Sequence, residues 1–356
     1  MQSKDDILKL LMEKSAEAAR KSQCGLILQP GAIGDCILTL PLVGFMKEKL
    51  NLGSVDMLGH TQYIGILPGR SCVDGIRSMD SLELHKLFTD AKTFDLPDGD
   101  PLITAFAGYS WIVTFLGEPY GNFEQNLIFT ANCSHSAEVI TLSLKPPAEL
   151  DLHVSDYYIR QFACDCGLSI EAAPVTQQDT LITPTQADAA TGRRWLREIG
   201  CDLSRKLVVI HPGSGGLEKC WHVDNFITLA QEIERKGNDV VFLLGPAEME
   251  RLDTAAINRI RGTAKCLAAL PLSDVVGVLS CADGFVGNDC GITHLAASLG
   301  RSTLALFGPT HPGRYRPVGP DVRILSLGGE DFASRPSPLA RQQVLAHITQ
   351  QHPGVC

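Results

Sequence analysis

The strongest constraint on the fold is an alternation of short apolar runs and longer helix-like segments through the second half of the chain. Parallel strands that are covered by helices on both faces appear in a sequence as continuous apolar runs of this length. The pattern therefore predicts a doubly wound α/β domain, which binds ligands at the carboxyl ends of its strands. The expected strands are KLVVIHPG, DVVFLLG, GFVGND and STLALFG, and the expected helices are VDNFITLAQEIERKG, AEMERLDTAAINRI, SDVVGVLSCA and ITHLAASLG.

The first half begins with a similar strand, turn and helix. GLILQ is expected to be a buried strand, PGAIG a glycine-rich turn and DCILTLPLVGFMKEKL the helix that follows. Further strands are expected at SVDMLG, PLITAFAG, WIVTFLG and AEVITLSL, and further helices at LELHKLF and VSDYYIRQFACDCG. A second α/β domain is the simplest interpretation.

Chain length supports the division, because a single hydrophobic core stops growing at roughly 250 to 300 residues and this chain has 356. The segment EAAPVTQQDTLITPTQ is rich in Pro, Thr and Gln, which is typical of a linker. We therefore expect an amino-terminal domain at 1–175 with a leading helix at 1–22, a second domain at 176–335, and a carboxy-terminal helix and tail at 336–356.

Charge, hydropathy and cysteine usage limit the classes of partner and the cellular location that we expect for this chain. The formal net charge of −9 makes nucleic acid an unexpected partner. The amino terminus lacks the basic start and apolar block of a signal peptide, and no apolar run is long enough to span a membrane. The dispersed cysteines are expected to be reduced thiols in the cytoplasm, and Cys164 and Cys166 lack the further ligands of a metal site. No metal and no cofactor are expected.

The first candidate loop is Pro30–Asp35, whose glycines allow a ligand to approach the backbone. It matches neither the dinucleotide fingerprint nor a P-loop. Asp35 has two interpretations at this stage, a helix N-cap or a functional carboxylate.

The second candidate loop is His211–Trp221, directly after an expected strand and before an expected helix. Its glycines and Ser214 suit a diphosphate, and Lys219 adds a positive charge that could stabilise a departing phosphate. A solvated surface lysine is the alternative for Lys219. For His211, a satisfied core histidine is as good an interpretation as a functional one, and Trp221 is expected to pack.

The third candidate loop, Asn288–His294, enters a helix whose first-turn amides could bind an anion. Asp289 could instead be a cap, and His294 could be core packing. Glu248 follows the strand end Gly245-Pro246, where a carboxylate can bond ribose hydroxyls; a simple helix-start acid is its alternative.

Three motifs together resemble glycosyltransferase family 9, the ADP-heptose:lipopolysaccharide heptosyltransferases. They are PGAIGDCILTLPL, HPGSGGLEKCWHVDNFITLA and GNDCGITHLAASLGRSTLALFGPTHP, and they span most of the chain in the family's order. The resemblance implies a GT-B fold, in which two Rossmann-like domains bind the acceptor and the nucleotide sugar respectively. It also implies a reaction that inverts the anomeric carbon.

The resemblance implies roles for individual residues. Asp35 looks like the general base, in an acceptor-side loop that also contains Gly31, Ala32, Ile33 and Gly34. Lys219 looks like the second catalytic residue, and it holds the donor diphosphate together with the amides around Ser214, Gly291 and Ile292. Asp289 and His294 match residues near the donor sugar, and Glu248 and Leu270 match ribose and adenine contacts. The full expected donor site is Gly213, Ser214, Gly215, Lys219, Glu248, Leu270, Asp289, Cys290, Gly291, Ile292 and His294. Cys290 and His222 depart from the family's usual Thr and Pro.

The expected function is therefore transfer of a heptose or related sugar from an ADP-sugar to a lipopolysaccharide-type or other glycan acceptor, without a metal. The alternatives are a related transferase with another nucleotide sugar or an O-antigen, capsule or protein acceptor, a non-catalytic nucleotide-sugar-binding protein, and a nicotinamide-dependent oxidoreductase, which the missing fingerprint disfavours. The resemblance implies a glycan or glycolipid partner and peripheral contact with the cytoplasmic face of the inner membrane. We also expect a monomer.

Overall fold

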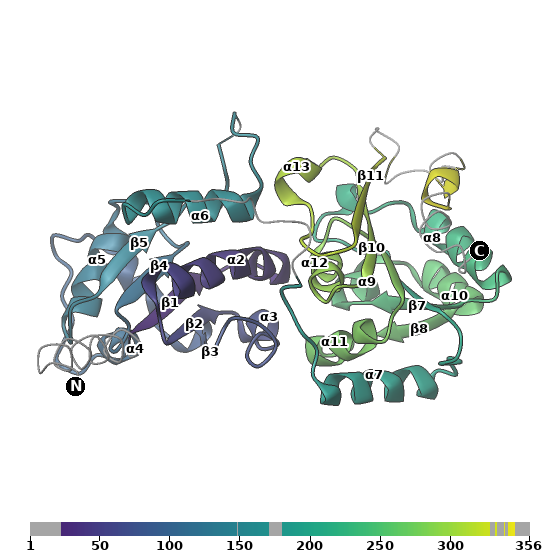
Figure 1. Cartoon of the computed structure of the whole chain (residues 1–356), viewed down its shortest axis with the longest axis horizontal. Helices are drawn as coiled ribbons and strands as arrows, with labels where there is room; N and C mark the ends of the chain where they lie inside the picture. The colour runs from purple at the N-terminus through teal and green to yellow at the C-terminus, as the bar shows by residue number, and fades with distance from the viewer. Residues whose placement is uncertain are drawn as a thin grey trace, which may run out of the picture. The chain divides into compact units, whose positions relative to one another are not determined.

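The computed structural model describes residues 23–147, 149–170 and 180–327, together with Phe332, Pro338 and residues 341–345. The expected leading helix at 1–22 and most of the expected linker lie outside the described residues. Pro338 and residues 341–345 are helical, as expected for the carboxy-terminal segment. The chain divides into two compact units, each built around one parallel sheet (Figure 1). The α/β prediction is confirmed for both halves.

The first unit has five parallel strands in the order β3-β2-β1-β4-β5. The strand order reverses direction between β1 and β4, which is the topological switch point of a doubly wound sheet. The strands are β1 (Cys24–Gln29), β2 (Ser54–Gly59), β3 (Gly75–Ser78), β4 (Trp111–Thr114) and β5 (Glu138–Thr141). The helices are α2 (Ile33–Leu50), α3 (Thr61–Ile64), η1 (Met79–Ser81), η2 (Leu84–Phe88), α4 (Pro101–Phe106), α5 (Asn122–Asn132) and α6 (Val154–Asp165).

Helices cover both faces of this sheet. On one face, Leu26 and Leu28 of β1 pack with apolar side chains of η2, α4 and α5. On the other, Phe162 of α6 makes edge contacts with Phe45 of α2 and Trp111 of β4, with ring centroids 6.3 Å apart in both pairs. Burial on both faces explains why β1 is apolar up to its last residue, Gln29.

The second unit has six parallel strands in the order β11-β10-β9-β6-β7-β8, with its switch point between β6 and β9. The strands are β6 (Leu207–His211), β7 (Asp239–Leu244), β8 (Lys265–Ala268), β9 (Gly284–Asn288), β10 (Ser302–Phe307) and β11 (Val322–Ser326). The helices are α7 (Gln186–Glu198), η3 (Leu217–Lys219), α8 (Val223–Arg235), α9 (Pro246–Arg251), α10 (Thr254–Thr263), α11 (Leu272–Ser280), α12 (Gly291–Ser298) and α13 (Pro312–Tyr315).

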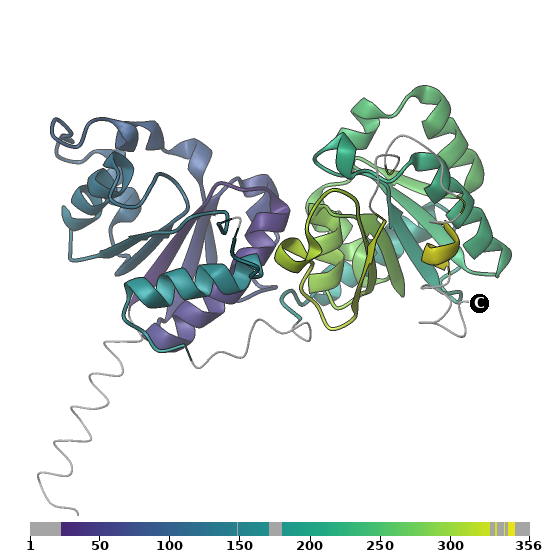
Figure 2. The ribbon, with the colours of Figure 1, turned by 90° about the horizontal axis from the view of Figure 1, so that it is seen from above.

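This sheet is also covered on both faces, as Figure 2 shows. One buried cluster joins Ile210, Phe242 and Val286 of the strands to side chains of α8 and α10. On the other side α7 and α11 pack closely, because Gly192 and Gly277 bring the two backbones together. A Cβ added to Gly192 would lie 2.0 Å from the Gly277 carbonyl oxygen. A larger residue at either position would therefore separate the two helices.

Two element predictions are wrong. PLITAFAG is not a strand: its first six residues form α4, since Asp100 accepts the Leu102 amide as an N-cap and Pro101 occupies the first helical position. AEMERLDTAAINRI is not one helix but two, α9 and α10. Asp253 caps the second of them by accepting the Ala256 amide.

Of the helices in the described ranges, none has the length and apolar character needed to cross a membrane.

Candidate functional site

The two loops that flank the switch point of the second sheet form the candidate site. One connects β6 to α8 and contains the glycine-rich segment Pro212–Gly216, which we call the glycine-rich loop. The other, Asp289-Cys290, connects β9 to α12. β6 and β9 are hydrogen-bonded neighbours, so both loops leave the same edge of the sheet side by side. This is the position at which doubly wound sheets bind ligands.

Buried side chains tie the two loops together. Asn288, fully buried at the end of β9, accepts the Trp221 amide at 2.9 Å and donates to the Pro212 carbonyl at 2.7 Å. It therefore holds both ends of the connection between β6 and α8. Ser214, also buried, donates its hydroxyl to the Asp289 carbonyl at 2.7 Å. Ser214 was expected at the site, but the bond shows its hydroxyl linking the loops.

Lys219 and His294 both approach the Asp289 carboxylate. Lys219 Nζ lies 3.5 Å from Oδ2, and His294 Nε2 lies 3.8 Å from Oδ1. Burial raises the pKa of Asp289, but the opposing effect of His294, Thr310 and Lys219 is larger. The pKa of Asp289 therefore lies below its ordinary value. Asp289 therefore carries a negative charge at neutral pH. Lys219 is accordingly an ion-paired residue at the site rather than an isolated surface lysine.

His294 retains one polar atom for another contact. Its side chain is 5% exposed, and among the residues that the structure describes, no group hydrogen-bonds to its buried Nδ1. A buried polar atom normally has a partner. Cys290 is the N-cap of α12 but makes no side-chain cap bond, and its Sγ lies 3.3 Å from the Thr293 hydroxyl. The amides of Gly291 and Ile292 begin α12, at the positive end of its dipole.

Glu248 is buried and already has a structural role. Its Oε2 accepts the Gly245 amide at 2.7 Å, so it closes the first turn of α9. The same oxygen lies 4.0 Å from His211 Nε2. Burial would lower the pKa of His211, but Cys290, Glu248 and the Leu243 carbonyl together raise it to about 9. His211 is thus a satisfied buried histidine, with Nδ1 2.8 Å from that carbonyl.

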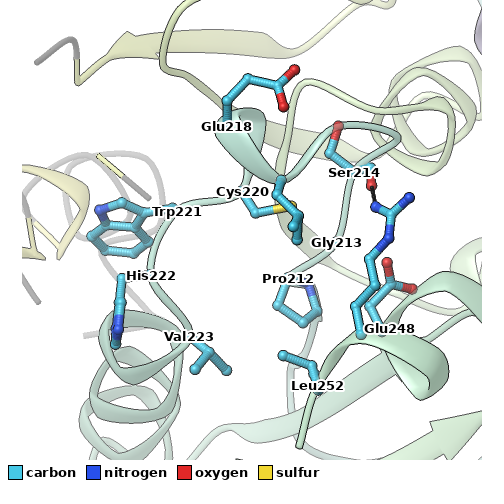
Figure 3. Close-up of a pocket in the computed structure, with 12 residues that line it drawn as sticks. Pro212, Gly213, Ser214, Glu218, Cys220, Trp221, His222, Val223, Glu248 and Leu252 are labelled. Carbon is cyan, nitrogen blue, oxygen red and sulfur yellow. Dashed lines mark hydrogen bonds between the residues drawn. The ribbon is translucent and has the colours of Figure 1, made fainter. Parts of the chain in front are cut away.

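A pocket of about 380 Å³ opens between the glycine-rich loop, the start of α8 and α9 (Figure 3). Gly213, Ser214 and Glu248 were expected to lie at the site, and all three line this pocket. Lys219, Asp289 and Leu270 do not line it; Leu270 follows β8, whereas the other two face each other across the loops. The lining residues are Pro212, Gly213, Ser214, Leu217, Glu218, Cys220, Trp221, His222, Val223, Glu248, Arg251 and Leu252.

Sequence reasoning missed several of these positions. Arg251 lines the pocket and bonds the glycine-rich loop, and Leu217 exposes 64% of its side chain there although it is apolar. Leu217, Val223 and Leu252 make the pocket partly apolar, which suits a flat organic group. Arg251 lies one helical turn beyond Glu248 on α9, and that spacing was the signal that could have revealed it.

The first loop follows β1 in the first sheet. Gln29, buried, accepts the Gly31 amide at 2.9 Å and donates to the Thr39 hydroxyl at 2.8 Å, so it orders the turn. α2 begins at Ile33, so Asp35 lies in the first turn of the helix, where its side chain is exposed. The interpretation of Asp35 as the N-cap residue is therefore wrong.

No cluster of three or more His, Cys, Asp or Glu side chains suited to a metal ion occurs within the described ranges. The positive groups that face the two loops are Lys219, Arg251 and the helix amides.

Comparison with known proteins agrees with this geometry. The family model for glycosyltransferase family 9 (heptosyltransferase) matches residues 157–338. The chain is 24% identical over 319 residues to lipopolysaccharide heptosyltransferase 3 of Escherichia coli K12, covering 80% of this chain and 82% of that protein. Two solved structures have its fold: a family 9 glycosyltransferase from Veillonella parvula (TM-score 0.69, 14% identity, covering 92% of this chain and 96% of the other) and ADP-heptose lipopolysaccharide heptosyltransferase II of E. coli (0.66, 17%, 93% and 100%). The fold is GT-B, as predicted.

Proposed function

Because the chain belongs to glycosyltransferase family 9, we propose that it transfers a heptose from ADP-heptose to a hydroxyl of a lipopolysaccharide-type acceptor, with inversion at the anomeric carbon. One observation carries the proposal. The loops after β6 and β9 meet at the switch point of the second sheet, with Lys219 beside Asp289 and the start of α12. Relatives that the chain covers over most of their length are lipopolysaccharide heptosyltransferases.

In this proposal the donor diphosphate binds between the two loops. The amides around Ser214, Gly291 and Ile292 would donate to its oxygens, and Lys219 would neutralise the charge that develops as ADP leaves. Lys219 is one third exposed, so its ammonium can leave Asp289 for a phosphate without a large desolvation cost. The buried His294 Nδ1 is a further polar atom for the donor. These groups would supply the positive charge at the diphosphate without a metal ion, so a chelator should leave activity unchanged.

The nucleoside is proposed to bind against the pocket beside the glycine-rich loop. Leu217, Val223 and Leu252 supply apolar surface, and Glu248 is the buried one of the two carboxylates in the lining, since Glu218 is exposed. Oε2 of Glu248 is engaged by the Gly245 amide, which leaves Oε1 for a ribose hydroxyl. Leu270, which follows β8, remains the proposed adenine contact. Asp289 would face the donor sugar.

Asp35 is the proposed general base, taking the proton of the acceptor hydroxyl as that oxygen attacks the anomeric carbon. Its side chain is exposed at the start of α2, as a base that meets an incoming acceptor must be.

The test is a transfer assay with ADP-heptose and heptose-deficient lipopolysaccharide, with EDTA present or absent. Wild-type protein should release ADP and extend the acceptor, while Asp35→Asn should lose at least about a hundredfold in kcat and still bind ADP. Glu48→Gln, an exposed acid on the same helix, is the matched control and should be fully active. Transfer from UDP-sugars instead of ADP-heptose would refute the donor assignment.

A further inference from the structure

Arg251 reaches from the end of α9 to the glycine-rich loop. Its Nη1 donates to the Ser214 carbonyl at 2.9 Å, a bond marked in Figure 3, and its Nη2 donates to the Gly215 carbonyl at 3.0 Å. A planar guanidinium can hold two consecutive carbonyls at once, whereas a lysine ammonium is a single point of attachment. Arg251 therefore fixes the orientation of two successive peptide groups.

The loop also rests directly on α9. A Cβ added to Gly213 would lie 1.6 Å from Glu248 Oε1, so only glycine fits there. By contrast, nothing lies within 4 Å of a Cβ added to Gly215, which is exposed. One side of the loop is thus packed on the helix, and Gly215 borders open space.

The orientation of the carbonyls sets that of the amides. In a trans peptide the N–H points opposite to the C=O of the same unit. Because the Ser214 and Gly215 carbonyls point at Arg251, the N–H groups of Gly215 and Gly216 point away from it. Neither amide has a hydrogen-bond partner among the residues described in the structure. Two successive N–H groups that point the same way can both donate to an anionic oxygen.

We propose that Arg251 is a positioning residue, which acts from behind the glycine-rich loop to aim the Gly215 and Gly216 amides at a phosphate of the donor. This inference rests on the proposed function, since it takes the anion to be the diphosphate of an ADP-sugar. Arg251 itself does not touch that phosphate. Its role is to hold the loop in the binding conformation and so to reduce the entropy lost on binding.

The test measures ADP and adenosine binding by calorimetry with the full-length protein. Arg251→Ala should weaken ADP on the order of tenfold, the effect of losing two charged hydrogen bonds that order the loop, and should change adenosine less than twofold. Arg251→Lys should remain weakened severalfold, because one ammonium cannot hold both carbonyls. Arg205 is an exposed arginine that pairs with Asp202, and both lie in the connection between α7 and β6. Arg205→Ala is the matched control and should bind as wild type does.

The outcomes separate this inference from its premise. If both Arg251 variants bind ADP as wild type does, or if Lys restores full affinity, Arg251 is not a loop clamp; the second result would indicate a direct charge on the phosphate. Equal losses for ADP and adenosine would also overturn the inference, since they would reflect the shape of the pocket alone. A wild-type protein that binds no ADP would instead refute the proposed function.

Discussion

Lys219 has a negative partner within the protein, Asp289, whose carboxylate also faces His294. If Lys219 stabilises the departing diphosphate, its effect must be larger in the transition state than in the bound donor. Lys219→Ala should therefore lower kcat by more than it raises KM for ADP-heptose, with a total loss of about ten- to a hundredfold in kcat/KM. Steady-state kinetics with varied donor measures both constants.

Lys49→Ala provides the comparison, because Lys49 is an exposed lysine that pairs with its sequence neighbour Glu48. It should leave both constants unchanged. A Lys219→Ala enzyme with normal kcat and raised KM would mean that the lysine contributes only to binding of the ground state.

The residues of the candidate site could be predicted where a local sequence pattern indicates them. Glycines and a serine after a buried strand indicated Ser214 and Lys219, and an acid before a helix indicated Asp289. Asn288 was recognised only as the first residue of its loop, and Arg251 was not recognised, because their roles arise from bonds to residues tens of positions away in sequence. Such tertiary contacts leave no local pattern.

α4 is capped at its start by the Asp100 side chain. The Asp100 carboxylate, 5% exposed, accepts the Leu102 amide at 2.9 Å and a bond from Lys86 Nζ at 3.1 Å. Asp100→Ala removes the cap and should reduce the free energy of unfolding of the first unit by about 1 kcal/mol. Urea denaturation followed by circular dichroism tests this. Asp98→Ala, two residues earlier and exposed, should have no measurable effect, and equal behaviour of the two variants would contradict the capping role.

The same cap explains why the apolar run PLITAFAG was wrongly predicted to be a strand. Periodicity alone cannot separate a short buried strand from a short helix, whereas Asp-Pro at its start is a helix signal. Three of the four edge strands were missed for another reason: β3, β8 and β11 contain few fully buried residues and lie at the margins of their sheets. Central strands such as β6 and β7, buried throughout, were predicted correctly.

At the scale of the whole molecule, the order of strands decides where the loops meet. Both sheets share the arrangement in which the first strand of the unit lies at the switch point, β1 beside β4 and β6 beside β9. The sequence indicated α/β domains with ligands at strand ends, and the crossover rules restrict how such strands can be arranged. The neighbours of each strand still had to be observed, because strand order depends on which helices pack together.

Buried and half-buried thiols in both units make the stability of the whole molecule sensitive to alkali. Burial raises the pKa of Cys36 to about 12 and the pKa values of Cys72 and Cys201 to about 11, from an ordinary value near 9. The folded protein keeps these protons above pH 9, whereas the unfolded chain releases them. Their contribution to stability is therefore complete below pH 9 and is lost as the pH rises toward the folded values.

Cys36 is fully buried, so it should dominate this loss and contribute about 2 kcal/mol of it by pH 10.5. Thermal unfolding between pH 8 and 11 should show a melting temperature that falls with pH, and Cys36→Ala should flatten that fall despite a lower starting value. Cys133→Ser, a change at an exposed thiol, should leave the slope as it is in the wild type. An unchanged slope in Cys36→Ala would mean that the pKa of this thiol does not differ between the folded and unfolded states. Alkaline unfolding would then be assigned to other groups, such as lysines and tyrosines, which titrate in the same range.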